Sequence, residues 1–314
     1  MAEDPRFTRL KLRDLHILHV VADAGSMAKA APLLAMSQPA VSRAIAEMEH
    51  ALGLPVFDRS SAGVELTAYG EVLRRRAINV ADEIKQGLGE LTFLADPTLG
   101  EIRIGSTEPM TALAASVIQR MSAAYPRVTF NLAAADTFAL HELLREREID
   151  IAITRMAANF DAYEDLQAEP LFEDELAVLA GRQNHLARRK RLALKDLMNE
   201  RWLLGSPDAS FLRPFIDEAF RREGLSPPRA TVISASHALR VNLLAAGPFL
   251  TILPRAILHY PRPDPTFVAL PVRLPTTRRP VGLVWLRHRS MSPITSLFCK
   301  LAREAAKLMR TGRK

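Results

Sequence analysis

The chain has 314 residues, enough for two or three domains of ordinary size. It is 48% hydrophobic and 25% charged, and no run approaches the roughly 18 apolar residues that a membrane span needs. The single cysteine, Cys299, excludes an internal disulfide and a cysteine-based metal cluster, and its apolar neighbours favour a buried thiol. The N-terminus lacks the apolar core of a signal peptide, so we expect a cytoplasmic protein.

The formal net charge of +7 would suit a nucleic-acid partner, but the basic residues are unevenly distributed. Residues 1–97 carry 11 Lys and Arg against 13 Asp and Glu, whereas residues 98–314 carry 31 against 22. The basic excess includes Arg188-Arg189-Lys190-Arg191 and Arg278-Arg279, for which we expect a solvated surface. Charge alone therefore gives no evidence for DNA binding in the N-terminal part.

Three helices are predicted in the first 52 residues. Apolar spacing predicts the first over Leu12–Ala24, ended by Gly25, and an alanine-rich second over residues 27–34. After a turn at residues 35–36, a third helix runs to Leu52 from Ser37, whose hydroxyl can cap its first turn. A buried stripe on this helix is predicted for Val41, Ile45, Met48 and Leu52.

The opposite side of the third helix carries polar residues at its N-terminal end. They are Gln38, Pro39, Ser42 and Arg43, next to the capping Ser37. Short polar donors and an arginine are used to read base edges and hold phosphates in a major groove. Helix, tight turn and capped helix are typical of a helix-turn-helix, here from Met27 to Ala46. The alternative is an ordinary all-α domain, in which such a pair of helices is also common.

Two short strands are predicted next, at residues 56–57 and 64–66, around turn-forming residues 58–63. They would form a two-stranded wing, from which Arg59 would reach the minor groove or the DNA backbone. Thr67 then caps a long helix that extends to about residue 95. Arg74-Arg75-Arg76 on this helix would either approach phosphates or only be solvated.

The long helix carries an approximate 3–4 repeat of apolar residues. The repeat consists of Leu73, Ala77, Val80, Ile84, Gly87 or Leu88, Leu91, and Leu94 or Ala95. Such a seam indicates helix pairing between subunits; the alternative is packing on the chain's own domain. Residues 96–100 form a predicted hinge.

After the hinge, predicted strands and helices alternate. The strands are 101–105, 128–133, 149–154, 176–180, 202–204, 230–234, 249–253, 267–271 and 281–286. The helices are 107–125, 140–146, 211–223, 236–246 and 292–309. This alternation predicts an α/β fold with a mostly parallel sheet covered by helices.

The N-terminal residues resemble the LysR-type transcriptional regulators. The matching stretches are residues 15–24, Gly25-Ser26-Met27, Ala30-Ala31, Ser37-Gln38-Pro39-Ala40-Val41-Ser42-Arg43, Glu49, Leu52-Gly53, Val56-Phe57-Asp58-Arg59 and Leu66-Thr67-Ala68-Tyr69-Gly70. More loosely, the later elements resemble the family's effector domain, which is similar to type 2 periplasmic binding proteins with two lobes around a cleft.

The resemblance implies three domains. These are a winged helix-turn-helix over 1–66, a linker and dimerisation helix over 67–96 and an effector-binding domain over 97–314. We expect the chain to cross between lobes near Pro170 and again within residues 271–275. Lobe one would then hold about 100–170 and 272–314, and lobe two about 171–271.

Ligands of open α/β sheets bind beyond the carboxyl ends of strands, where helix N-termini offer N–H groups. The junctions with suitable polar residues are Gly105-Ser106-Thr107-Glu108-Pro109, Gly205-Ser206-Pro207-Asp208-Ala209-Ser210, Ser234-Ala235-Ser236-His237, Ala135-Asp136-Thr137 and Thr154-Arg155. The candidate effector-binding residues are Ser106, Thr107, Asp136, Arg155, Ser206 and Ser236.

The family resemblance implies a small-molecule inducer, commonly a carboxylate, at the first junction. Arg155 and the N–H groups of Ser106 and Thr107 would then meet an anionic group. The alternative is that these Ser and Thr residues only cap helices. Glu108 would compete with an anion, so an inducer with hydroxyls or a cationic group, such as a sugar derivative or an amine, stays open.

No enzyme motif is present: there is no Gly-x-Ser-x-Gly elbow, Walker phosphate loop or dinucleotide fingerprint, and no His-x-x-x-His pair. We therefore expect neither catalysis nor a cofactor or metal. A transporter's solute-binding protein would need a signal peptide and no DNA-reading domain.

The sequence thus predicts an inducer-controlled transcription activator or repressor. Its partners would be an interrupted palindromic operator, a second copy of itself in a homodimer or homotetramer, and RNA polymerase if it activates.

Overall fold

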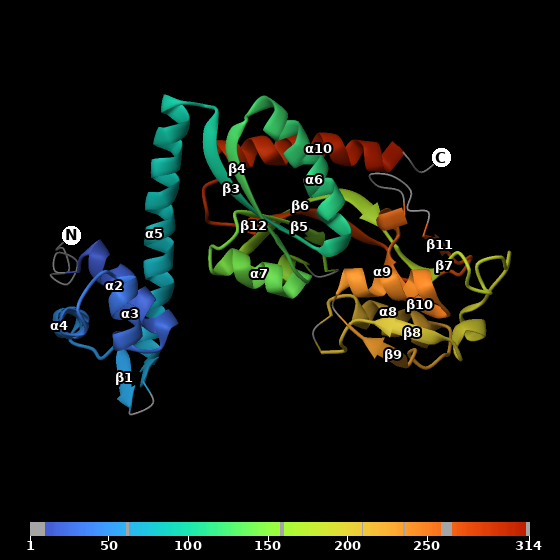
Figure 1. Cartoon of the computed structure of the whole chain (residues 1–314), viewed down its shortest axis with the longest axis horizontal. Coiled ribbons are helices and arrows are strands. Elements are labelled where there is room, and N and C mark those ends of the chain that lie inside the picture. The colour runs from blue at the N-terminus through green and yellow to red at the C-terminus, as the bar shows by residue number, and fades with distance from the viewer. Residues whose placement is uncertain are drawn as a thin grey trace. The chain divides into compact units, whose positions relative to one another are not determined.

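The computed structural model describes residues 10–60, 63–157, 160–208, 210–234, 236–258 and 266–311 (Figure 1). The chain separates into two compact units, one up to Leu91 and one from Thr92. Each unit is described by itself. Among the described residues, no helix is both long enough and apolar enough to cross a membrane.

The first unit contains helices and one hairpin. Its elements are α2 (Leu12–Ala24), α3 (Met27–Leu33), α4 (Gln38–Leu52), β1 (Phe57–Ser60), β2 (Gly63–Leu66) and α5 (Ala68–Ala95), the last of which runs on into the second unit. Gly25 and Gly53 end α2 and α4 with φ of 63° and 70°, the left-handed conformation that favours glycine. The three predicted helices and the wing are confirmed with small shifts at their ends.

The predicted boundary of the helix-turn-helix at Ala46 does not coincide with the end of a helix. Met27 begins α3 as expected, but Ala46 lies in the middle of α4, where it is exposed. The helix continues to Leu52, and Gly53 N–H then donates to the Glu49 carbonyl at 2.8 Å. The predicted motif from Met27 to Ala46 thus takes in α3 and the first part of α4, and its role as the DNA-reading motif stays a prediction.

The core of the first unit lies where α4 packs against α2 and α3. Val41, Ile45 and Met48 of the predicted stripe are buried, and Leu52 packs partly against the same core. Because this stripe covers one side of α4, the other side of the helix remains exposed at its N-terminal end. The hairpin lies beside the α2–α3 turn, where Val64 N–H donates to the Gly25 carbonyl at 3.1 Å.

The second unit contains two five-stranded sheets, each with helices packed on it. The sheet of lobe one has the order β4-β3-β5-β12-β6, formed by β3 (Leu99–Ser106), β4 (Arg127–Ala134), β5 (Ile151–Arg155), β6 (Leu166–Asp174) and β12 (Arg279–Leu286). Its helices are α6 (Thr111–Ala124), α7 (Thr137–Arg145) and α10 (Pro293–Thr311). Cys299 on α10 is buried as predicted, and burial raises the pKa of its thiol to about 12.

Lobe two repeats the arrangement with the strand order β11-β7-β10-β8-β9. Its strands are β7 (Leu176–Gly181), β8 (Arg201–Leu204), β9 (Ala230–Ile233), β10 (Phe249–Pro254) and β11 (Phe267–Ala269). Its α-helices are α8 (Arg213–Arg222) and α9 (His237–Ala246). Trp202 on β8 and Phe220 on α8 meet edge to face in the core, with ring centroids 6.0 Å apart.

The prediction of a mostly parallel sheet is confirmed for four of the five strands in each sheet, but each sheet is mixed because one strand runs the opposite way. In lobe one, β3 pairs in parallel with β4 and β5, but β12 pairs antiparallel with both β5 and β6. In lobe two, β8 pairs in parallel with β9 and β10, but β7 pairs antiparallel with β10 and β11. Strand–helix alternation gives the parallel pairs, whereas the first strand after each crossing, β7 in lobe two and β12 in lobe one, runs opposite to the other four strands of its sheet.

The prediction of a crossing near Pro170 was wrong. Pro170 lies inside β6, a strand that the sequence pattern did not predict, and the chain enters lobe two only after Asp174. β6 is an edge strand, and its register with β12 shifts between Val281 and Gly282, opposite Pro170. Edge positions and bulges are where a sheet tolerates proline, so Pro170 does not end the strand.

The return crossing lies at the end of the predicted 271–275 segment. Leu270 and Leu274 still pack in the core of lobe two, and the next strand of lobe one begins at Arg279. Between them, Thr277 is buried, and its hydroxyl accepts a hydrogen bond from Leu176 N–H at 3.2 Å. The two crossings therefore touch each other.

Candidate functional site

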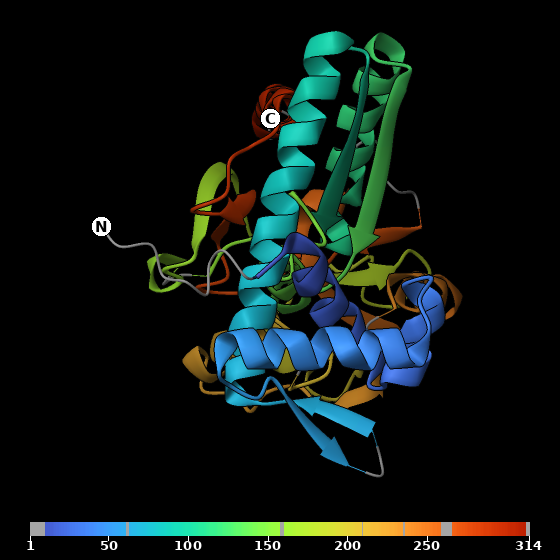
Figure 2. The same cartoon turned by 90° about the vertical axis from the view of Figure 1, so that its left-hand side faces the viewer.

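The N-terminal end of α4 presents the predicted polar residues on its exposed side. The Ser37 hydroxyl caps the helix by accepting a hydrogen bond from Ala40 N–H at 3.4 Å. Gln38, Pro39 and Arg43 are exposed, and Ser42 is half-buried. Figure 2 shows the blue α4 lengthwise, with the β1–β2 hairpin below it. All five residues thus occupy one accessible end of a helix that is anchored by its opposite face.

Glu49 joins the wing to α4, a role that sequence reasoning missed. Its Oε1 accepts hydrogen bonds from Val56 N–H at 2.9 Å and Phe57 N–H at 3.2 Å. Its Oε2 lies 3.4 Å from Arg59 Nη2, so the predicted wing arginine is held against α4 while its side chain stays 47% exposed. The other predicted turn residues Ser61 and Ala62 lie outside the described residues.

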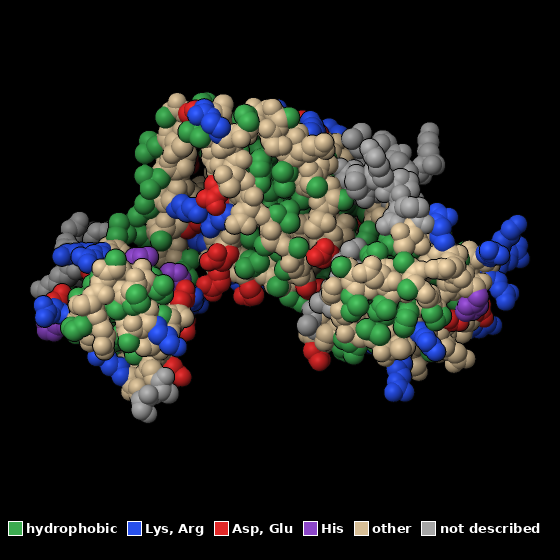
Figure 3. Space-filling model, viewed as in Figure 1, with side chains coloured by type: hydrophobic (Ala, Val, Ile, Leu, Met, Phe, Trp, Pro, Cys, Tyr) green, Lys and Arg blue, Asp and Glu red, His purple; other side chains and the backbone are tan. Residues whose placement is uncertain are grey.

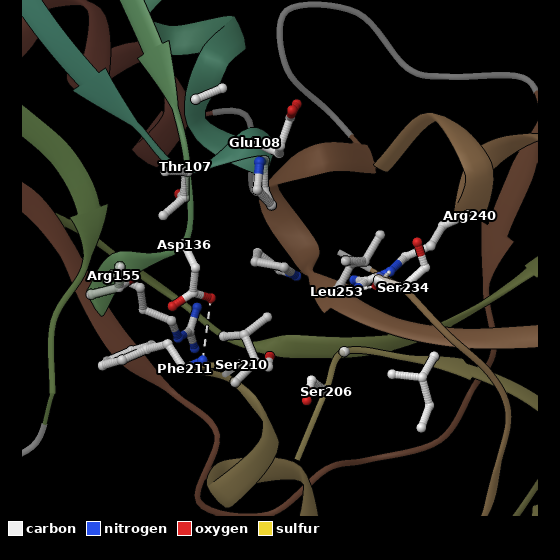
Figure 4. Close-up of a pocket in the computed structure, with 18 residues that line it drawn as sticks. Thr107, Glu108, Asp136, Arg155, Ser206, Ser210, Phe211, Ser234, Arg240 and Leu253 are labelled. Atoms are coloured by element: carbon white, nitrogen blue, oxygen red, sulfur yellow. Dashed lines mark hydrogen bonds between the residues drawn. The ribbon is translucent and has the colours of Figure 1, made fainter. Parts of the chain in front are cut away.

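The second unit contains a pocket of about 390 Å³ between its two lobes (Figure 4). The lining residues include the predicted Thr107, Asp136, Arg155 and Ser206. The others are Glu108, Pro109, Ala134, Ala135, Thr137, Gly205, Ser210, Phe211, Leu212, Ile233, Ser234, Arg240, Leu253 and Pro254. The pocket therefore combines hydroxyls, two acids and two arginines with apolar side chains.

Two predicted effector residues do not line this pocket. Ser106 is fully buried, and its hydroxyl donates to the Thr107 carbonyl at 3.1 Å. Ser236 caps α9, where its hydroxyl accepts a hydrogen bond from Leu239 N–H at 3.2 Å. Ala209 and Ala235, which belong to two of the predicted junctions, lie outside the described residues.

Asp136 connects the two lobes beside the pocket. As the N-cap of α7 in lobe one, it accepts a hydrogen bond from Phe138 N–H at Oδ1, 3.2 Å away. Its Oδ2 accepts a second hydrogen bond, also at 3.2 Å, from Phe211 N–H of lobe two, so this bond joins the two lobes. Burial raises the pKa of the Asp136 carboxyl, while these N–H donors and the charge of Arg240 oppose the rise.

Arg155 holds the two crossings together. Its Nη2 donates to the Asp174 carbonyl at 2.8 Å and to the Thr277 carbonyl, and its Nη1 lies 3.7 Å from Asp174 Oδ2. Burial lowers the pKa of the Arg155 guanidinium to about 10, despite the nearby Asp174 carboxylate. Its charge is paired with this buried carboxylate, but its buried Nε and Nη1 make no hydrogen bond within the described part of the chain, so the expected contact with an anionic ligand stays a prediction.

Arg240 is the cation of the pocket that sequence reasoning missed. It lies on α9 in lobe two, and its Nε donates to the Ser234 carbonyl at 3.1 Å. Burial lowers the pKa of its guanidinium. An arginine one turn into a helix is usually solvated, so only the packing of α9 against β7 and β10 could reveal it.

The two basic segments of the second unit differ in their exposure. Arg188, Arg189, Lys190 and Arg191 are exposed in lobe two, where Figure 3 shows basic side chains gathered at one end. Arg279 instead stacks over the Phe215 ring, 5.2 Å from its centroid.

Two family models match this chain, one over the part that contains α4 and the hairpin and one over the part that contains the pocket. Residues 12–71 match the family described as "Bacterial regulatory helix-turn-helix protein, lysR family", and residues 95–307 match the LysR substrate binding domain. The chain belongs to the LysR family of transcriptional regulators. This LysR-family protein is a DNA-binding transcription regulator with an effector-binding domain, and its family is one of regulators rather than enzymes.

Relatives of this LysR-family protein, and solved structures that are similar to it, match most of the chain. The HTH-type transcriptional regulator GbpR of Azospirillum brasilense is 30% identical over 291 residues, covering 91% of this chain and 83% of GbpR. Full-length CbnR complexed with its target DNA has a TM-score of 0.65 and 21% identity, covering 94% of this chain and all of CbnR. The effector-binding domain of QuiR in complex with shikimate has a TM-score of 0.55 and 23% identity, covering 67% of this chain and 98% of that domain.

Proposed function

We propose that this protein reads an operator through the exposed end of α4 and the wing, under the control of a small molecule bound between the lobes. Gln38, Ser42 and Arg43 would read or position the bases, and Pro39 would contact a thymine methyl group. Ser37 would add a contact at the helix N-terminus, and Arg59 would hold the backbone or the minor groove. The observation that carries the proposal is the exposed polar end of α4 on a helix whose other side is buried. Such a regulator would act on DNA in the cytoplasm as an activator, a repressor or both.

A homodimer would form along α5. Ala77 is buried and Leu73 packs on the core of its own unit, so these two members of the predicted seam point inward. The following apolar residues are exposed, and Figure 3 shows hydrophobic side chains along this helix. They are Val80 (38% exposed), Ile84 (43%), Leu88 (60%) and Leu91 (64%). Exposed apolar residues at this spacing favour a partner helix, and pairing of the effector domains would extend the dimer to a tetramer.

The pocket between the lobes would hold the inducer. Thr107, Asp136, Arg155 and Ser206 line it from both lobes, and the complex of the QuiR effector-binding domain with shikimate supports a small molecule there. Ser106 and Ser236 would contribute only by shaping the helix starts. An inducer can shift the regulator only if its affinity differs between two arrangements of the lobes. Inducer binding would change the spacing of the DNA-reading domains or the bend of the operator DNA. If the protein is an activator, it would also contact RNA polymerase.

The test is a footprint of the full-length protein on the DNA upstream of its own gene, at two salt concentrations. We expect protection of an interrupted palindrome with half-sites about one helical turn apart. The variant Arg43→Ala should weaken binding to the operator by about 5- to 150-fold, since a bidentate base contact is worth about 1–3 kcal/mol. Arg222→Ala, on an exposed face of lobe two, removes the same charge and should leave the footprint unchanged. Diffuse binding that both variants share would contradict the assignment of α4.

A further inference from the structure

The pocket between the lobes contains a carboxylate and a guanidinium group on opposite sides. Asp136 extends from lobe one and Arg240 from lobe two, and Figure 4 shows them apart, with pocket space between them. Among the residues that the structure describes, neither has an oppositely charged side chain within the 4.0 Å of an ion pair. They still attract each other at longer range, because each charge stabilises the charged form of the other.

Each of the two groups is fixed by backbone contacts and keeps capacity for a ligand. The Asp136 oxygens each accept one backbone N–H, and a carboxylate oxygen has room for another donor. The Arg240 guanidinium is held by the Ser234 carbonyl, and it lies against Gly205, where a Cβ would be 3.4 Å from Nη2. Its remaining N–H groups can serve an incoming acceptor.

The other charged groups of the pocket do not change this balance. Arg155 is matched by the buried Asp174 and donates to two carbonyl groups. Glu108 is exposed at the edge of lobe one and adds negative charge on the side of Asp136. The charge of Arg155 is offset by Asp174, so the lobe-one side of the pocket is acidic on balance, and Arg240 is the cation on the lobe-two side.

We propose that the inducer is a zwitterion of the amino-acid class, with its ammonium group toward Asp136 and its carboxylate toward Arg240. This proposal rests on the proposed function, in which the pocket holds the inducer. A half-buried charge is costly unless it is paired, so a ligand with both charges relieves both groups. A simple anion would satisfy Arg240 but repel Asp136, and a neutral polyol would supply neither charge. Phe211, Leu212, Ile233 and Leu253 would surround an apolar side chain.

The experiment measures thermal unfolding of the full-length protein with each of the twenty L-amino acids. It also uses the decarboxylated amine and the deaminated acid of every amino acid that binds. We expect at least one amino acid to raise the melting temperature by about 5–10 °C when it is present at about 100 times its Kd. Its amine and its acid should each bind at least about tenfold more weakly, because each lacks one charge-assisted contact.

The variants Arg240→Gln and Asp136→Asn assign the two contacts. Arg240→Gln removes the cation that pairs with the ligand carboxylate, so in this variant the amino acid should bind no better than its amine. Asp136→Asn removes the anion that pairs with the ligand ammonium group, so in this variant the amino acid should bind no better than its deaminated acid. These comparisons within one variant remain valid even if the variant is less stable. Arg222→Gln and Glu218→Gln, which remove an exposed ion pair on α8, should preserve both preferences.

Two results would overturn the amino-acid class. One is the absence of a shift with any amino acid; the other is a shift in which the amine or the acid binds as well as its parent. Panels of monosaccharides and of dicarboxylates are run beside the amino acids, and a shift with one of these alone would identify a different inducer class. Operator protection is measured separately, so an intact footprint with no amino-acid binding would reject the ligand and leave the regulator in place.

Discussion

Replacing Glu49 with Ala should destabilise the first unit through the junction of α4 with the wing. The substitution removes the acceptor of two backbone donors, Val56 N–H and Phe57 N–H. Both residues are buried, and the Glu49 side chain is only 19% exposed, so water replaces the lost acceptor poorly. An orphaned buried donor costs about 1–3 kcal/mol, so for two donors we expect a loss of about 2–6 kcal/mol. The pair with Arg59 adds little, because the arginine is largely exposed.

The matched control for this prediction is Glu49→Gln, which keeps an oxygen at the same position but loses the charge. We expect it to cost about 1 kcal/mol or less. Unfolding of the first unit is followed by hydrogen exchange of the Ile45 and Met48 amides in α4, which do not bond to the Glu49 side chain. The tryptophans Trp202 and Trp285 both lie in the second unit, so their fluorescence reports that unit separately. Equal stability of the two variants, or an equal shift of the tryptophan transition, would refute the reasoning.

Three further substitutions test other parts of the fold by chemical denaturation. Ala35→Val, at a turn residue with φ of 51°, should cost more than about 1 kcal/mol, whereas Ala35→Gly should change stability by about 0.5 kcal/mol or less; equal costs would contradict this. Arg155→Met removes the cation beside the buried Asp174 carboxylate and should cost about 3–5 kcal/mol; a loss below about 1 kcal/mol would argue against Arg155 holding the two crossings together. Burial lowers the pKa of His141 from 6.5 to about 4, so the unfolded chain takes up a proton first as the pH falls. Stability should therefore fall between pH 6.5 and 4, by about 2 kcal/mol at about pH 5, and His141→Phe should remove this dependence.

The first unit could be predicted closely because its signals are local. A capping serine, glycines after two helices and a buried stripe at helical spacing each act within a few residues. The contacts that orient the wing are less visible, because Glu49 meets Val56 across a turn and its periodicity suggests only a helical surface residue. Chain order alone gives no register for such a contact.

The second unit could be predicted as strands and helices but not as a sheet arrangement. Alternation does not distinguish a parallel neighbour from a strand that leaves or re-enters a lobe, so the antiparallel pairs of β12 were missed. Pro170 suggested a chain break, although an edge strand with a bulge accommodates it. Four of the six candidate effector residues, Thr107, Asp136, Arg155 and Ser206, line the pocket, and their contact with an effector stays a prediction. Arg240 was missed because its position depends on how α9 packs.

The contacts between the lobes differ in strength in a way that bears on how a ligand could act. At the crossings, Arg155 joins the buried Asp174 and the Thr277 carbonyl, and breaking such a buried pair costs several kcal/mol. At the pocket, the lobes meet through the hydrogen bond from Phe211 N–H to Asp136 and the edge-to-face pair of Phe138 with Phe211, each worth about 1 kcal/mol. A ligand that engages Asp136 competes with the weaker set and leaves the stronger one intact. We therefore expect the lobes to move about the crossings, with the pocket side as the end that changes.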